Sequence, residues 1–97
     1  MEKELMEKLD RRVVAISEKM KELGFDLEED MRELVELRED IAELILTTKL
    51  KKISYFVEKD NKGVGFYLGD LQITFFLEYG EDEEGPYYEA TVEIIEG

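Results

Sequence analysis

The first segment of the chain carries apolar side chains at alternating spacings of four and three positions, namely Leu9, Val13, Ile16, Met20 and Leu23. Leu5 extends this repeat by one more step of four. Such a narrow seam is typical of a helix that packs against another helix. Gly24 and Phe25 then suit a Schellman cap, because glycine accepts the left-handed conformation and Phe25 can cover Met20. The pattern predicts a helix over about residues 2–23.

A wider apolar stripe follows this cap and predicts a second helix that ends near residue 48. Asp26 and Glu29 form a capping-box-like pair at its start. The link between the helices has two residues, so the helices run antiparallel and form a helical hairpin over about residues 2–48.

From Ile53 onward the apolar period changes to two, which indicates β-strands. Short turns divide this part into four strands, and they predict an antiparallel β-meander over about residues 52–96. Gly65 lies inside the second strand and indicates a bulge or a close approach of another group. One face of the sheet is strongly apolar and should pack on the helices. The predicted fold is a single α+β domain over residues 1–97, in which the N-terminal helical hairpin packs on the meander (ααββββ).

Apolar side chains also recur on the sheet face opposite the predicted core. This candidate interaction surface consists of Phe56, Tyr67, Phe76, Tyr87 and Ile95. A contiguous apolar patch of this kind marks an interface. Stacking of nucleobases would also need cations for the phosphates, and no Lys or Arg follows Lys62. We therefore expect a homodimer or another protein partner on this face, and no direct binding of nucleic acid.

The net charge is −13 and is unevenly distributed. Residues 1–25 contain six acids and six bases, whereas residues 63–97 contain nine acids and no base. A candidate acidic surface consists of Glu29, Glu33, Glu36, Glu39, Asp40, Glu43, Glu81, Asp82, Glu83 and Glu84. Such a surface repels nucleic acid and anionic lipid and attracts a partner with a basic surface.

Arg38 interrupts the apolar stripe of the second predicted helix. It could form a salt bridge to an acid of the first helix, or extend its guanidinium to solvent at the rim of the stripe. It could also specify the helix register or a partner contact, as a polar residue in a helical seam can.

The acidic turn between Gly80 and Gly85 is a candidate site for a divalent cation. Calcium loops supply oxygens at alternating positions that converge on the ion, and four consecutive carboxylates do not converge in this way. We expect a solvated turn, and no metal or cofactor.

Catalysis has little support in the composition, because the chain contains no Cys and no His. This removes thiol nucleophiles, disulfides and the commonest general base. Glu78 and Glu89 can face each other across a hairpin, but they lie on the predicted polar face without a nucleophile. We expect that the protein is not an enzyme. The N-terminal stretch lacks the apolar core of a signal peptide, and no apolar run reaches membrane-spanning length, so a cytoplasmic location is expected.

These patterns together favour a small acidic, non-catalytic protein-interaction module. An alternative is an inhibitor that imitates nucleic acid and occupies a basic cleft, of the anti-restriction or anti-CRISPR type that phages and mobile elements use. A weak divalent-cation binder or a carboxylate enzyme is a third possibility. The scarcity of side-chain amides and the abundance of Glu and Lys fit a thermophilic source, and equally a designed sequence.

Overall fold

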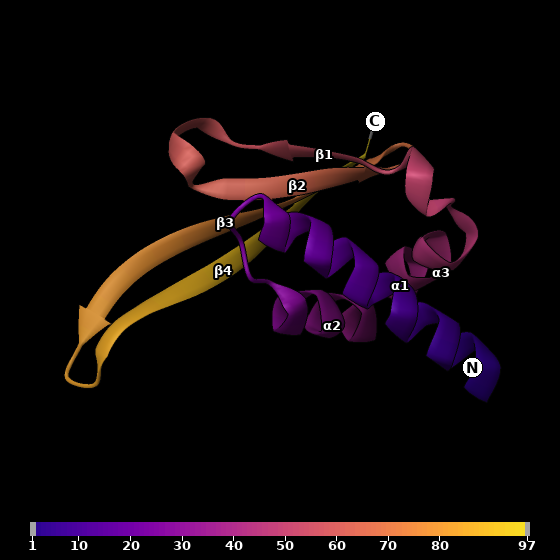
Figure 1. Ribbon diagram of the computed structural model, residues 1–97, viewed down its shortest axis with the longest axis horizontal. Helices are drawn as coiled ribbons and strands as arrows, with labels where there is room; N and C mark the ends of the chain where they lie inside the picture. Colours follow the sequence, from indigo (N-terminus) through magenta and orange to yellow (C-terminus); the bar gives the residue numbers. More distant parts are fainter. Residues whose placement is uncertain (1, 97) are drawn as a thin grey trace.

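The computed structural model describes residues 2–96 and has three α-helices followed by a four-stranded antiparallel sheet (Figure 1). The α-helices are α1 (Lys3–Glu22), α2 (Glu28–Leu37) and α3 (Glu39–Thr47), and two short 3-10 turns are η1 (Leu50–Lys52) and η2 (Lys59–Asn61). The strands are β1 (Ser54–Val57), β2 (Gly63–Leu68), β3 (Leu71–Asp82) and β4 (Gly85–Glu96). The predicted α+β fold is therefore confirmed. Of the predicted domain over residues 1–97, residues 1 and 97 lie outside the described part.

The end of α1 is the predicted Schellman cap. The backbone N–H of Phe25 donates to the carbonyl of Met20 at 3.0 Å, and that of Gly24 donates to the carbonyl of Lys21 at 2.9 Å. Gly24 adopts φ +103°, a conformation that glycine reaches without a steric penalty. This turn reverses the chain and brings α2 back along α1.

The second predicted helix is wrong in one respect, because it is broken at Arg38. The backbone of Arg38 is extended (φ −128°, ψ 95°) and separates α2 from α3. Met31 and Leu34 before the break, and Ile41 and Ile45 after it, are all buried. The apolar repeat runs through the break in phase, and the sign of the break in the sequence is Arg38 itself, the polar residue that interrupts the stripe. The bend lets two short helices pack against one long one.

The predicted capping box at the start of this helix is also wrong. Leu27 is the N-cap residue of α2, and no side chain forms a capping hydrogen bond there. The side chain of Leu27 is 1% exposed. The residue at the start of α2 is therefore a buried apolar one, and it is not the capping Asp26 that the sequence predicted.

The strands are ordered β1-β2-β3-β4, each antiparallel to its neighbours. One sheet face packs against the helices, which lie together on the same side of the sheet (Figure 1). The strand residues of this shared core are Val64, Phe66, Leu68, Leu71, Ile73, Phe75 and Leu77, and Ile53 joins them from the position before β1. The predicted assignment of the core face is confirmed.

The hairpin of β3 and β4 extends past the helical layer and curves away from it (Figure 1). Near its tip the hairpin is tied to the connection between α1 and α2 by Tyr88, whose hydroxyl donates to the backbone carbonyl of Asp26 at 3.0 Å. Tyr79 packs next to Tyr88, with 6.3 Å between the ring centroids. The acidic turn is thus carried at the far end of a long two-stranded arm.

Candidate interaction surface

The strand register places the five predicted apolar residues on the sheet face that the helices leave uncovered. Tyr67 is paired with Gln72, which is paired with Ile95, so these side chains form one row across the sheet. Tyr67 and Ile95 are 43% and 45% exposed. Phe76 lies opposite Thr91 and is half-buried. The structure thus contains an open row of apolar side chains where the sequence predicted it.

Two of the aromatic rings on this face lie over glycines of the neighbouring strand. Phe56 is paired with Gly65, and a Cβ added at Gly65 would lie 2.4 Å from Cζ of Phe56 and 2.5 Å from the carbonyl oxygen of Ile73. Tyr87 covers Gly80 in the same way, at 2.6 Å. Aromatic rings that fill the space above glycines are a known means of stabilising a strand pair. The face is therefore flatter than five projecting side chains would make it.

Carboxylates border the apolar row on the side of β4 and the hairpin. Glu78 and Glu89 are directly paired across β3 and β4, and Glu93 is paired with Thr74, with the Phe76–Thr91 pair between these two rows. All three carboxylates are exposed. We use the name outer sheet surface for this set of residues. It consists of Phe56, Tyr67, Phe76, Glu78, Tyr87, Glu89, Glu93 and Ile95.

The acidic turn is a tight, exposed connection between β3 and β4. The carboxylate of Asp82 accepts a hydrogen bond from the backbone N–H of Glu84 at 2.9 Å, and Gly85 follows with φ +120°. Glu81, Asp82, Glu83 and Glu84 are all exposed. Within residues 2–96 no group of three or more metal-ligating side chains is positioned to hold an ion.

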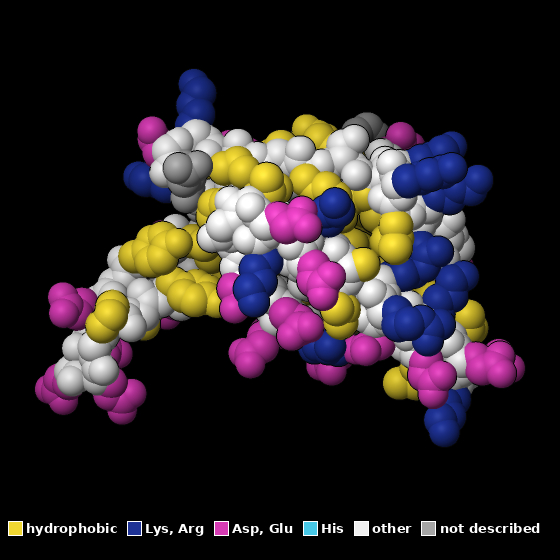
Figure 2. Space-filling model, viewed as in Figure 1, with side chains coloured by type: hydrophobic (Ala, Val, Ile, Leu, Met, Phe, Trp, Pro, Cys, Tyr) yellow, Lys and Arg dark blue, Asp and Glu magenta, His cyan; other side chains and the backbone are white. Residues whose placement is uncertain are grey.

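The candidate acidic surface is divided between two places. Six members lie exposed on α2 and α3, on either side of the bend, and four lie at the hairpin tip. The helical members are Glu29, Glu33, Glu36, Glu39, Asp40 and Glu43. Figure 2 shows that the charged side chains at the hairpin tip are all acidic. The bend and the separation of the tip mean that these carboxylates do not follow one straight line along a single helix.

Two aspartates at the starts of α2 and α3 have opposite surroundings. Burial beside β4 raises the pKa of Asp30 above its ordinary value, and Glu33 adds to the effect. The guanidinium of Arg38 instead lowers the pKa of Asp40, because Nε and Nη2 donate to its two oxygens at 3.0 and 2.8 Å. The carboxylate of Asp30 is therefore disfavoured by burial and by a like charge, whereas that of Asp40, a member of the candidate acidic surface, is stabilised by a cation.

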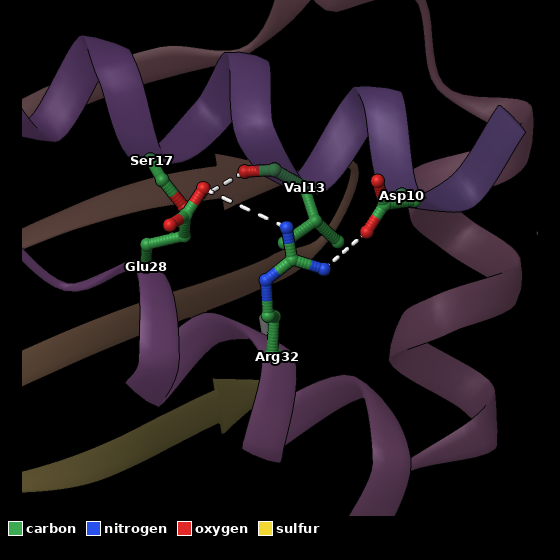
Figure 3. Close-up of polar contacts among 5 residues, drawn as sticks. All are labelled: Asp10, Val13, Ser17, Glu28 and Arg32. Carbon is green, nitrogen blue, oxygen red and sulfur yellow. Dashed lines mark hydrogen bonds and ion pairs between the residues drawn. The ribbon is translucent and has the colours of Figure 1, made fainter. Parts of the chain in front are cut away.

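Arg38 is thus paired with Asp40, two residues away, rather than with an acid of the first helix. The interhelical ion pair predicted for it is formed by Arg32 of α2, which contacts Asp10 of α1 (Figure 3). Arg32 also lies 3.6 Å from Glu28, one turn before it. Because all these groups are partly exposed, the pair orients α2 on α1 more than it stabilises the fold.

The contact of Arg12 with the end of α3 was not predicted from the sequence. Its guanidinium reaches from α1 to the C-terminal end of α3 and donates to the carbonyls of Ile45, at 3.0 Å, and Thr48. These carbonyls have no partner within the helix, and a cation at this end also complements the helix dipole. Arg12 lies on the edge of the α1 seam, and an arginine next to a heptad seam was the only signal available.

No family model, curated protein or solved structure matches this chain. Among the described residues, no helix has both the length and the apolar character needed to cross a membrane.

Proposed function

We propose that this protein is a non-catalytic interaction module that binds a protein partner through the outer sheet surface. The partner presents apolar side chains to the row around Tyr67 and Ile95, and cations to the carboxylates beside it. The observation that carries the proposal is the register, which places exposed apolar side chains on an uncovered sheet face where every charged strand residue is a carboxylate.

Charge favours a basic partner over a second copy of this chain on this face. Face-to-face packing of two copies would bring Glu78, Glu89 and Glu93 of each close to those of the other. Like charges opposed across an interface weaken it and steer copies apart. A partner with Lys or Arg around an apolar centre satisfies the same surface, and the charge of −13 accelerates its approach.

A defined peptide probe tests the proposal. The probe is a cationic peptide of about twelve residues that alternates Lys and Leu, long enough to cross a sheet of this width. It is titrated into isotopically labelled protein while the amide NMR shifts are followed. We expect the largest shifts in β2, β3 and the C-terminal half of β4. Tyr67→Thr combined with Ile95→Thr should weaken binding by about ten-fold, because two apolar contacts are removed.

The matched control is Leu37→Thr, because Leu37 is 75% exposed and lies at the end of α2, on the helical side of the molecule. Its binding should equal that of the unchanged protein. Equal affinity in the Tyr67/Ile95 variant would overturn the proposal, since it would show attraction by net charge alone. Shifts confined to α2 and α3 would also overturn it, and they would favour the nucleic-acid-mimic alternative, which requires the helical carboxylates as the contact surface.

A further inference from the structure

A pocket lies on the helical side of the sheet, between α1, η1 and the start of β1. Its lining consists of Ala15 and Lys19 of α1, Leu50 and Lys51 of η1, and Ile53 and Tyr55 at the start of β1. The pocket has a volume of about 410 Å³, and most of its surface is apolar. Sites for small molecules in proteins have volumes of this order and combine an apolar lining with a few polar groups.

The apolar floor of the pocket is only partly covered by the protein itself. Ala15 is half-buried and carries no more than a methyl group, so it leaves space next to the edge strand β1. Leu50 is 38% exposed. Tyr55 is half-buried, and its ring packs on the core with its centroid 6.1 Å from that of Phe66. A ligand with an apolar body would cover these side chains.

The two charged side chains in the lining are both cations, although the net charge of the protein is −13. Lys51 lies in η1 next to Lys52, and Lys49 directly precedes this turn. Figure 2 shows the side chains of Lys and Arg gathered at the place where Figure 1 draws η1. Residues 47–57 contain three bases and no acid. The surroundings of the pocket therefore favour an anionic group.

Two residues of the lining can donate hydrogen bonds to such a group. Nζ of Lys19 lies 3.7 Å from Oε2 of Glu22, and both side chains are mostly exposed. An ion pair of this kind is weak in water, so it does not prevent Lys19 from binding another anion. Burial raises the pKa of Tyr55 to about 12. The Tyr55 hydroxyl therefore stays protonated at neutral pH and can donate a hydrogen bond.

We propose that this pocket binds a small organic anion with an apolar body, such as a medium-chain carboxylate. The apolar part lies on Ala15, Leu50 and Ile53, and the anionic group binds to Lys19 and Lys51. Such a site selects its ligand against the net charge, because a protein of charge −13 otherwise attracts cations. The pocket and the outer sheet surface lie on opposite sides of the sheet, so either proposal can fail without the other.

Octanoate is the probe, and octan-1-ol and octylammonium are its uncharged and cationic counterparts. Each is titrated into isotopically labelled protein at pH 7 and constant ionic strength while the amide NMR shifts are followed. Octanoate should bind with a dissociation constant of about 1 mM, in keeping with a ligand of about ten non-hydrogen atoms. The largest shifts should lie in residues 15–19 and 50–55. Octan-1-ol should bind about five-fold more weakly, because it lacks the charge, and octylammonium more weakly still.

A double substitution tests the role of the cations. Lys19→Gln combined with Lys51→Gln should raise the dissociation constant of octanoate about five- to ten-fold, and should change that of octan-1-ol by less than about two-fold. The control is Lys21→Gln combined with Lys59→Gln. It makes the same change in net charge at two exposed lysines outside the lining. Its affinity for octanoate should equal that of the unchanged protein.

A substitution at Ala15 tests the apolar part of the pocket. Ala15→Leu fills the space next to β1, so it should weaken the binding of octanoate and octan-1-ol alike, by at least about ten-fold. Ala15→Ser is the matched variant, because it keeps a small side chain at the same position. It should bind octanoate within about two-fold of the original affinity. Circular dichroism confirms that each variant is folded.

Three results would overturn the proposal. The first is octylammonium binding as tightly as octanoate, which would show attraction by net charge alone. The second is octanoate causing no shifts around the pocket, or shifts only in other parts of the molecule. The third is unchanged affinity for octanoate in the Lys19/Lys51 variant.

Discussion

The exposed end of α1 and the outer sheet surface are similar in apolar exposure and differ in charge. Met6 is 57% exposed on the first and Tyr67 is 43% exposed on the second. Residues 2–12 hold equal numbers of acids and bases, whereas residues 63–96 hold nine acids and no base. Both regions expose apolar area, which by itself does not indicate a partner.

The charges separate the two regions. Every charged side chain of the outer sheet surface is a carboxylate, which suits the basic partner that we propose for it. The end of α1 has no net charge, so charge neither attracts a basic partner to it nor repels one. The comparison therefore favours the sheet as the site for the proposed basic partner.

The prediction with the largest expected effect concerns stability, and it tests whether the outer sheet surface requires the close packing of Phe56 on Gly65. Gly65→Val places a side chain where a Cβ would lie 2.4 Å from Cζ of Phe56 and 2.5 Å from the carbonyl oxygen of Ile73. Phe56 can rotate away, but the backbone carbonyl cannot move without disturbing the strand pair. We expect the free energy of unfolding in urea to fall by about 2–3 kcal/mol.

The comparison variant for this prediction is Tyr67→Thr, two positions further along the same strand and on the same face. It removes a ring contact with Phe56, whose centroid lies 5.1 Å away, but it creates no overlap. Its unfolding free energy should fall by about 0.5–1 kcal/mol. If the two variants were equally stable, the glycine would not be required by close packing.

A smaller effect tests this difference in charge. As the NaCl concentration rises from about 0.05 to 0.5 M, the Lys-Leu peptide should bind about ten-fold more weakly, because salt screens its attraction to the carboxylates. The binding constant is measured by the same NMR titration at each salt concentration. Affinity that stays constant with salt would contradict a role of the carboxylates in binding.

Much of the fold was predictable, because the change in apolar period near Ile53 separates helices from strands without tertiary information. The Schellman cap at Gly24 was likewise local. The break at Arg38 was not predicted, because the apolar stripe keeps its phase through it and a polar residue in such a stripe is also compatible with a continuous helix. The capping of α3 by Arg12 joins residues that are more than thirty positions apart, and no local pattern reports such a contact.

The candidate surfaces were predictable to a different degree. The alternation of side chains within β2 and within β4 was enough to place Tyr67 and Ile95 on the sheet face away from the core, because successive side chains of a strand point to opposite faces. The pattern could not show that Phe56 lies flat on Gly65, because that depends on the pairing between strands. The exposure of the N-terminal end of α1 was not predictable either, because the apolar seam is continuous along the helix. How much of that seam is covered depends on how α2 and α3 are placed by the bend between them.

The prediction with the smallest expected effect is a change in Tm, and it tests whether the negative charge of Asp30 destabilises the fold. The pKa of Asp30 is raised by burial and by Glu33, so the folded protein binds more protons than the unfolded chain between the unfolded pKa, about 3.9, and the higher folded one. Stability therefore falls as pH rises through this window. Asp30→Asn removes the penalty, and it should give a small rise in Tm at pH 7 that disappears at about pH 3, where the carboxyl is neutral in both states.

Asp40→Asn is the matched variant, because it also removes one acid from the first turn of a helix. The pKa of Asp40 is lowered by Arg38, so this carboxylate contributes stability above its unfolded pKa and loses it as pH falls through the folded pKa. Its Tm should therefore fall at pH 7, and the difference should vanish in acid. Net charge alone would shift both variants in the same direction. Opposite shifts at pH 7 would show that the charge of Asp30 destabilises the fold through burial and its acidic neighbours, whereas the charge of Asp40 stabilises it through Arg38.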